Sequence, residues 1–233
     1  MTPANHQSRS SATLGAKPPL PAPGEIHLWR LDLDLAEADP ASLSEAERAR
    51  AAKLRTPELA HRFVAGRAFL RRTLAAYLDC APEAVRFAYN PYGRPGLAAA
   101  PFDFNLSHSG ALALLAVAQG TVGVDVEHPD PDADLREIGR QVMSPAELAA
   151  FEALAASERE PAFYALWTAK EAVIKALGTG FSRDARTLHI GWRAPLALID
   201  GAQSFEVRPL SLPGGVPAAV ALDRPIARIS WAS

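Results

Sequence analysis

The sequence predicts an α+β fold, and three observations support this class. Segments with helical spacing and segments with strand-like spacing are mixed without strict alternation, which disfavours a doubly wound α/β sheet. Side-chain capping signals mark helix starts, and short apolar or alternating runs mark strands. Hydrophobic residues make up 48% and charged residues 21% of the 233 residues, as is typical of a globular protein with a sizeable core.

The first part of the chain predicts one strand and two helices. Leucine alternates with aspartate over residues 31–35, which is the pattern of a strand with one solvent-facing side. Ser44 and Glu47 form a capping box that opens a short basic helix ending near Lys53. Thr56, followed by proline, opens a longer helix. Its apolar residues at helical spacing are Leu59, Phe63, Leu70, Leu74 and Tyr77.

The second part predicts several strands. Ala111–Ala118 is an apolar run between two glycines, and valines alternate over residues 122–126, so both segments are expected to be buried strands. A boundary near Gly120 would divide the ordered part of the chain into two halves of similar size. After Arg186 the expected strands are Phe205–Leu210, Ala218–Leu222 and Ile226–Trp231.

Two helices are expected between these strands. Ser144 with Glu147 starts a capped helix. Ser157 with Glu160 starts a long helix that ends at Gly178, because glycine readily adopts the left-handed conformation that stops helices.

Composition excludes several classes of function. A net charge of -2 argues against a general polyanion binder, so a phosphate site must be local and no nucleic-acid partner is expected. The single Cys80 excludes an intrachain disulfide and is expected to be buried. Residues 1–24 are rich in Pro, Ser, Ala and Gly and are expected to form a disordered leader. The longest apolar run is too short to cross a membrane, so a cytoplasmic protein is expected.

Two acidic residues on one strand suggest a metal site. Asp125 and Glu127 lie two positions apart, so their side chains share the face opposite the valines. A divalent cation relieves the repulsion between neighbouring carboxylates, and hard oxygen ligands suit magnesium. The alternative is an ordinary solvated strand face.

The long helix contains a lysine where an apolar residue is expected. Lys170 falls in the middle of the apolar stripe, so its ammonium must reach solvent or meet an anion. Glu171 and Lys175 lie on the margin of that stripe. Their simplest interpretation is a surface ion pair between residues four positions apart.

A small polar segment, residues 105–110, contains Ser107 and His108. We interpret it as a tight loop that could hold a phosphate. A glycosylation sequon, a hydrolase site and a plain turn are alternatives, although no secretion signal and no Gly-x-Ser-x-Gly elbow accompany it. Arg50, Arg62 and Arg94 belong to basic residues that would supply a local positive field or only a solvated surface.

Taken together, these motifs resemble the 4′-phosphopantetheinyl transferase superfamily. The resemblance covers residues 50–181 and rests on residues 122–127 and on the run from Trp167 to Glu171 followed by Lys175, with Ser107 and His108 upstream. The length resembles the longer branch, typified by the surfactin synthetase activator. This implies a monomeric pseudo-dimer of two similar α+β halves, residues 25–120 and 121–233. Each half would have a small antiparallel sheet packed with a long helix.

The resemblance also implies roles for single residues. Asp125, Glu127 and Glu171 would bind magnesium, with manganese as the alternative, and Glu171 would also be the catalytic base. Lys170, treated as catalytic, and Lys175 would contact the pyrophosphate and pantetheine arm of coenzyme A. The remaining expected coenzyme contacts are Ser107 and His108 at the 3′-phosphate, together with Arg50, Arg62 and Arg94. One departure is Glu47, where a close relative would have lysine.

The implied reaction joins coenzyme A and an apo acyl or peptidyl carrier protein. The carrier serine attacks the β-phosphorus of coenzyme A, and adenosine 3′,5′-bisphosphate leaves. A non-catalytic coenzyme A or carrier-binding module and a magnesium-dependent hydrolase are the alternatives. The choice of carrier, the acceptance of acyl-coenzyme A and the preferred metal stay open.

Overall fold

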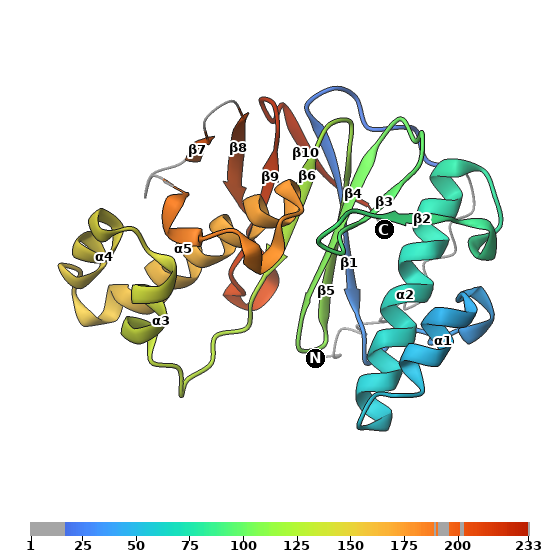
Figure 1. The fold of residues 1–233 in the computed structure, drawn as a ribbon, viewed down its shortest axis with the longest axis horizontal. Helices are drawn as coiled ribbons and strands as arrows, with labels where there is room; N and C mark the ends of the chain where they lie inside the picture. Colours follow the sequence, from blue (N-terminus) through green and yellow to red (C-terminus); the bar gives the residue numbers. More distant parts are fainter. Residues whose placement is uncertain (1–16, 189, 191–195, 201–202, 233) are drawn as a thin grey trace, which may run out of the picture. The chain divides into compact units, whose positions relative to one another are not determined.

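The computed structural model describes residues 17–188, 190, 196–200 and 203–232. It divides the chain into two compact units, one formed mainly by Leu31–Val85 and the other by Leu20–Arg30 with Arg86–Ala232. Helices and sheets occur together, which confirms the α+β class (Figure 1). Within the described ranges, no helix is both long and apolar enough to span a membrane.

The first unit is helical, and both predicted helix starts are confirmed. The Ser44 hydroxyl and the Glu47 carboxylate form the expected capping box, and Thr56 Oγ1 accepts a hydrogen bond from the Leu59 backbone N–H at 3.2 Å. Cys80, expected to be buried, is exposed just beyond the second helix. The elements are η1 (Pro40–Ser42), α1 (Glu45–Ala51), α2 (Pro57–Leu78) and η2 (Pro82–Ala84).

Glu47 joins the two helices of this unit. Its carboxylate accepts hydrogen bonds from the guanidinium groups of Arg67 and Arg71. Burial acts to raise the pKa of Glu47, but hydrogen bonds from Ser44, Arg71 and Arg67 lower it to about 2. Glutamate at this position therefore has a structural role that a lysine could not fill.

The strand predicted over residues 31–35 is wrong. β1 spans Glu25–Asp32 and ends where the Asp32 side chain accepts hydrogen bonds from the backbone N–H groups of Asp34 and Leu35. This Asx turn ends the strand, and beyond it Leu33 is buried while Leu35 is 65% exposed.

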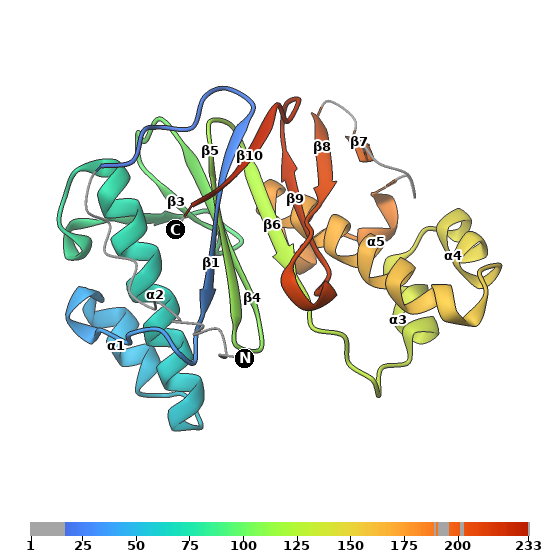
Figure 2. The ribbon, with the colours of Figure 1, turned by 180° about the vertical axis from the view of Figure 1, so that it is seen from behind.

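The second unit contains two four-stranded sheets and a small hairpin. The first sheet has the order β10-β1-β5-β4, and the second has the order β6-β9-β8-β7 (Figures 1 and 2). β10 pairs in parallel with β1, so the first sheet is mixed rather than purely antiparallel. The strands are β2 (Phe87–Tyr89), β3 (Pro95–Leu97), β4 (Asp103–Ser109), β5 (Leu112–Ala118), β6 (Val122–Val126), β7 (Leu196–Asp200), β8 (Gln203–Pro209), β9 (Ala218–Leu222) and β10 (Arg228–Ala232).

The expected leader, residues 1–24, is only partly described. Residues 1–16 lie outside the described residues. Pro21 is buried, and its carbonyl oxygen accepts a hydrogen bond from the Gln119 side chain at 2.9 Å. The chain is therefore packed against the second unit before β1 begins.

The α-helices described in the second unit are α3 (Leu135–Val142), α4 (Pro145–Glu152) and α5 (Ala156–Leu177). The Ser144–Glu147 capping box of α4 and the left-handed Gly178 stop of α5 are confirmed. α5 begins before the predicted Ser157, because the Glu158 carboxylate accepts the Ala155 backbone N–H at 3.2 Å.

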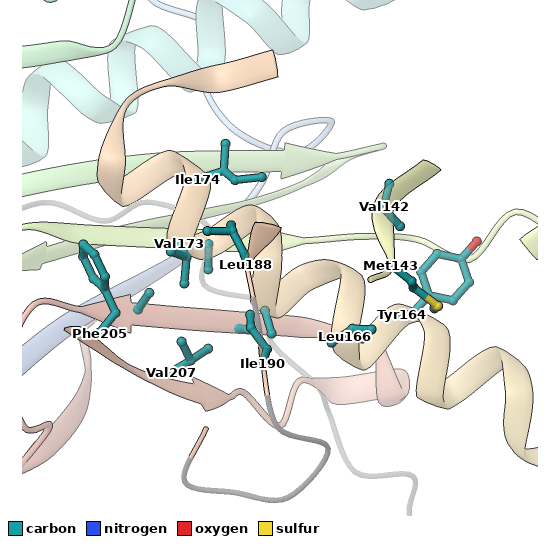
Figure 3. Packing of buried hydrophobic residues seen from close by; sticks show 14 of the residues in the cluster. Val142, Met143, Tyr164, Leu166, Val173, Ile174, Leu188, Ile190, Phe205 and Val207 are labelled. Atoms are coloured by element: carbon teal, nitrogen blue, oxygen red, sulfur yellow. The ribbon is translucent and has the colours of Figure 1, made fainter. Parts of the chain in front are cut away.

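α5 packs on the second sheet and forms the larger core. Leu166, Val173 and Ile174 of α5 belong to the same buried cluster as Phe205 and Val207 of β8 (Figure 3). Gly123 allows this packing, because a Cβ at that position would lie 1.9 Å from the Ala172 carbonyl oxygen of α5. The close contact between β6 and α5 brings together the two segments that contain most of the predicted site.

Side chains of β4 join the edges of the two sheets. β4 and β6 belong to different sheets but lie side by side in both views (Figures 1 and 2). The Val122 backbone N–H donates to Asp103 Oδ2, and the Val124 N–H donates to Asn105 Oδ1, both at 3.0 Å. Side-chain oxygens of β4 thus replace the carbonyl partners that a neighbouring strand would offer to the edge of β6.

Candidate active site

Asp125 lies in a buried polar cluster between β4, β6 and α5. The residue is 1% exposed, and its Oδ1 accepts hydrogen bonds from the Ser107 hydroxyl at 3.0 Å and from the Lys175 ammonium. Lys175 also donates to Ser107 Oγ at 2.7 Å. Asp125 Oδ2 is buried and has no hydrogen-bond partner among the described residues. The alternative of a solvated strand face is therefore excluded for Asp125.

Burial and mutual repulsion perturb two carboxyl groups of this cluster. Burial raises the pKa of Asp125 to about 6, against the lowering effect of the Lys175 ammonium. Burial also raises the pKa of Glu171 to about 7, and the negative charges of Asp125 and Glu127 raise it further, while Lys175 lowers it. Ionising both Asp125 and Glu171 is therefore unfavourable, and a bound cation would reduce the repulsion between the two carboxylates.

Glu127 lies one residue beyond the end of β6. Its Oε1 accepts the indole N–H of Trp167, and its Oε2 accepts the Ser109 hydroxyl, both at 3.2 Å. The side chain is thereby held by α5 on one side and by β4 on the other.

The donor set fits a hard divalent cation such as Mg²⁺ or Mn²⁺. Asp125 Oδ2 is a buried acceptor without a hydrogen-bond partner among the described residues, and the charges of Asp125 and Glu127 add to burial in raising the pKa of Glu171. In the part of the chain that is described, no three His, Cys, Asp or Glu side chains already stand close enough to hold an ion together. The ammonium of Lys175 supplies the positive charge next to Asp125 in this arrangement.

The polar segment around Ser107 and His108 is part of strand β4 rather than a loop. Ser107 is buried and faces Asp125, while His108 is exposed. Desolvation of the ring by neighbouring protein atoms lowers the pKa of His108, and the Lys175 ammonium lowers it further. The charge of Glu127 raises it. Both predicted residues therefore lie near the carboxylate cluster. Ser107 faces into the protein, whereas His108 is accessible from solvent.

Lys170 points away from this cluster. Its ammonium donates to Glu147 Oε2 at 2.7 Å and to the carbonyl oxygens of Val142 and Ala185 at 2.9 and 2.8 Å, and the residue is 1% exposed. The expected anion for this lysine is therefore Glu147 within the protein. All three ammonium donors are engaged, so no donor faces a coenzyme.

Arg94 is also engaged within the second unit. Its guanidinium forms an ion pair with Asp103 at 2.6 Å and donates to the carbonyl oxygens of Lys175 and Val122 at 2.8 and 3.0 Å. These contacts fasten the loop after β2 to β6 and to the end of α5.

Arg50 and Arg62 lie on the first unit, each beside a local partner. The Arg50 guanidinium lies 5.3 Å from the centre of the Phe63 ring and is exposed. Arg62 forms ion pairs with Asp34 and Glu58.

Sequence reasoning did not identify three residues of the cluster as partners. Asn105 and Ser109 alternate with Ser107 on β4, and Trp167 precedes Lys170 by about one turn of α5. A strand assignment for residues 103–109 would have placed Asn105, Ser107 and Ser109 on one face. The loop interpretation concealed that periodicity.

Two family models match consecutive parts of the chain. The model of the 4′-phosphopantetheinyl transferase superfamily matches residues 121–211, and that of the 4′-phosphopantetheinyl transferase N-terminal domain matches residues 29–120. The two matches meet between residues 120 and 121.

Individual relatives agree with the family models. The 4′-phosphopantetheinyl transferase HetI of Nostoc sp. is 39% identical over 168 residues, which cover 68% of this chain and 71% of HetI. The 4′-phosphopantetheinyl transferase Sfp of Bacillus subtilis is 30% identical over 141 residues, or 60% of this chain and 62% of Sfp. The 4′-phosphopantetheinyl transferase AcpT of Escherichia coli K12 is 39% identical over 119 residues, or 50% and 57%. The chain therefore belongs to the 4′-phosphopantetheinyl transferase superfamily, and its enzyme type is that of a phosphopantetheinyl transferase.

Proposed function

We propose that this enzyme transfers the 4′-phosphopantetheine group of coenzyme A to a serine of an apo acyl or peptidyl carrier protein. Adenosine 3′,5′-bisphosphate is the second product, and Mg²⁺ or Mn²⁺ is required. The observation that supports this proposal best is the buried, unpaired Oδ2 of Asp125 beside Glu171 and Glu127.

Asp125, Glu127 and Glu171 are the proposed metal ligands. When bound, the ion neutralises charge on the pyrophosphate and on the leaving phosphate. Because both family models match consecutive parts of this single chain, we also propose that the enzyme acts as a monomer. We propose a cytoplasmic location, as expected from the sequence.

Glu171 is the proposed base. Its carboxylate belongs to the same acidic cluster as Asp125 and Glu127, and a positioned carboxylate can accept a proton as a general base. The serine oxygen forms a bond to the β-phosphorus, and the bond to the bridging oxygen breaks. The bridging oxygen departs with adenosine 3′,5′-bisphosphate. The serine proton passes to Glu171 directly or through water.

Lys175 is the proposed cation for the coenzyme pyrophosphate. Its side chain is 31% exposed, so its ammonium can turn from Asp125 toward a ligand. His108, exposed on β4, is the proposed contact of the 3′-phosphate. Ser107 was expected to share this contact, but its hydroxyl donates to Asp125 and accepts from Lys175, so we do not propose it. Arg50 and Arg62 remain proposed contacts of the nucleotide. Lys170 and Arg94 are not among the proposed coenzyme contacts, because their donors are engaged within the protein.

The first experiment is intact-mass spectrometry of apo carrier proteins incubated with the enzyme, coenzyme A and Mg²⁺. We expect a carrier heavier by one phosphopantetheine group, only with metal present. Asp125→Ala should abolish the gain while the variant remains folded, whereas Asp132→Ala, which removes an equal charge from the exposed loop before α3, should not.

The outcomes separate the alternatives. Unmodified carriers of several classes, with coenzyme A still bound, would support a binding module. Cleavage of coenzyme A without any carrier would support a hydrolase. Normal turnover by Asp125→Ala would contradict the metal assignment.

A further inference from the structure

Glu127 occupies a position from which its carboxylate could easily swing away. It follows the last residue of β6 and is only partly buried. Its backbone N–H is held by the Pro217 carbonyl oxygen at 3.0 Å, but a glutamate side chain has three further rotatable bonds. Something beyond the strand must therefore fix the two oxygens if Glu127 is to bind a cation.

The Ser109 hydroxyl has its single proton directed at Glu127. Ser109 Oγ accepts the backbone N–H of His128 at 3.0 Å and lies 3.2 Å from Glu127 Oε2. A carboxylate can only accept, so the hydroxyl proton of Ser109 lies between the two oxygens. The acceptor role toward His128 and the donor role toward Glu127 together fix the rotation of the hydroxyl.

Trp167 holds the other oxygen from the helix side. Its indole nitrogen is a donor only and lies 3.2 Å from Glu127 Oε1. The indole is stacked on the Phe163 ring, with ring centres 6.2 Å apart and planes 9° from parallel. Packing against Phe163 therefore holds the indole that donates this hydrogen bond.

Both donors to Glu127 are neutral, which distinguishes it from Asp125. Asp125 is paired with the positively charged Lys175, and that charge competes with any second cation. Ser109 and Trp167 orient Glu127 without cancelling its charge. Each oxygen of the carboxylate also keeps a second lone pair for another partner.

We propose that Ser109 and Trp167 are positioning residues that hold the Glu127 carboxylate ready for the divalent cation. The inference rests on the proposed function, because it concerns the same metal site. Neither residue touches the reacting atoms; both act through Glu127.

The test measures Mn²⁺ binding to the coenzyme-loaded enzyme, from the electron paramagnetic resonance signal of free Mn²⁺. Partners that orient metal ligands change metal affinity by about 10-fold to 100-fold, so we expect Ser109→Ala and Trp167→Phe each to weaken Mn²⁺ binding about 10-fold. Ser109→Thr retains the hydroxyl and should restore the affinity. Coenzyme A binding in the presence of EDTA should change less than about twofold.

The matched control is Thr168→Val, which removes a hydroxyl next to Trp167. Thr168 Oγ1 bonds the Tyr164 carbonyl oxygen of its own helix at 2.9 Å, so Mn²⁺ affinity should not change. The two positioning variants should also raise the KM for Mg²⁺ while kcat at saturating Mg²⁺ stays near the wild-type value. A residue that only stabilised the fold would not raise the KM for Mg²⁺ while leaving kcat unchanged.

Two results would overturn the inference. Wild-type Mn²⁺ affinity in both Ser109→Ala and Trp167→Phe would do so, as would a Ser109→Thr variant as weak as Ser109→Ala. If the wild-type enzyme bound no Mn²⁺ even with coenzyme A, the metal-dependent function and the inference would fail together. Mn²⁺ binding by the wild-type enzyme tests the proposed function, and Mn²⁺ binding by the variants tests the positioning role, so the two failures are distinguishable.

Discussion

Replacing Gly123 with alanine tests the contact that assembles the active site. An ideal Cβ would lie 1.9 Å from the Ala172 carbonyl oxygen and 2.6 Å from the Ala176 nitrogen. Both atoms belong to the backbone of α5 and cannot rotate away. Because carbon–oxygen contacts settle at about 3.3 Å or more, β6 and α5 would have to separate by about 1.4 Å. Overpacking of this kind costs about 1–3 kcal/mol, and we expect Gly123→Ala to lie near the upper value.

The separation should damage catalysis more than stability alone predicts. β6 bears Asp125, while α5 bears Glu171 and Lys175, so widening the gap pulls the cluster apart. A misplacement of about 1 Å lowers rates by about 100-fold in positioned active sites. We expect a loss of this size in the rate of carrier modification, measured by intact mass below the unfolding midpoint.

Urea denaturation gives the matching change in the free energy of unfolding. Gly139→Ala on α3 is the control, because its added Cβ would lie 3.4 Å from the Met143 sulfur, and alanine is favoured over glycine by about 0.5–1 kcal/mol within helices. Its urea midpoint should be unchanged or higher. A Gly123→Ala enzyme with wild-type midpoint and rate would refute the argument that the β6–α5 contact positions the site.

Two further predictions concern the buried charges. Lys170→Met should lower the free energy of unfolding by about 3–5 kcal/mol in urea denaturation, because it leaves Glu147 buried without its cation. A second change, Glu147→Gln, should restore part of the loss. A Lys170→Met variant as stable as the wild type would contradict this role. Burial raises the pKa of Asp125 to about 6 and that of Glu171 to about 7, so the folded state binds these protons more tightly than the unfolded state does. Their contribution to stability therefore falls as pH rises from about 4 toward 7. Asp125→Asn should reduce this slope, measured by thermal unfolding in EDTA. An unchanged slope would argue against the raised pKa of Asp125.

The helix starts at Ser44 and Ser144 could be predicted because their cause is local. The capping boxes at Ser44 and Ser144 join residues three positions apart, so the pattern in the chain is the structure itself. The prediction for residues 31–35 failed because it used only the alternation of leucine and aspartate. The strand ends at Asp32, whose side chain forms a turn that this alternation does not reveal. The parallel pairing of β10 with β1 joins residues about 200 positions apart. No local pattern could indicate it.

The carboxylates of the site could be predicted for a similar reason. Asp125 and Glu127 share a face because strands repeat every two residues. The partner of Lys170 could not be predicted, because Glu147 lies 23 residues upstream on another helix. Periodicity showed that this lysine required an anion, but it could not distinguish a coenzyme phosphate from a carboxylate within the protein.

The chemistry of β4 changes along its length in step with β6. Asp103 and Asn105 present oxygen acceptors where β6 offers backbone N–H groups, and Ser107 and Ser109 present hydroxyl donors where β6 and the residue after it offer carboxylates. If these two edges instead paired through their backbones, their main-chain N–H and C=O groups would satisfy each other, and no side-chain donors would be directed at the carboxylates. The junction of two sheet edges thus leaves an acidic cluster buried yet oriented. That arrangement is suited to receiving a cation together with a phosphate ligand.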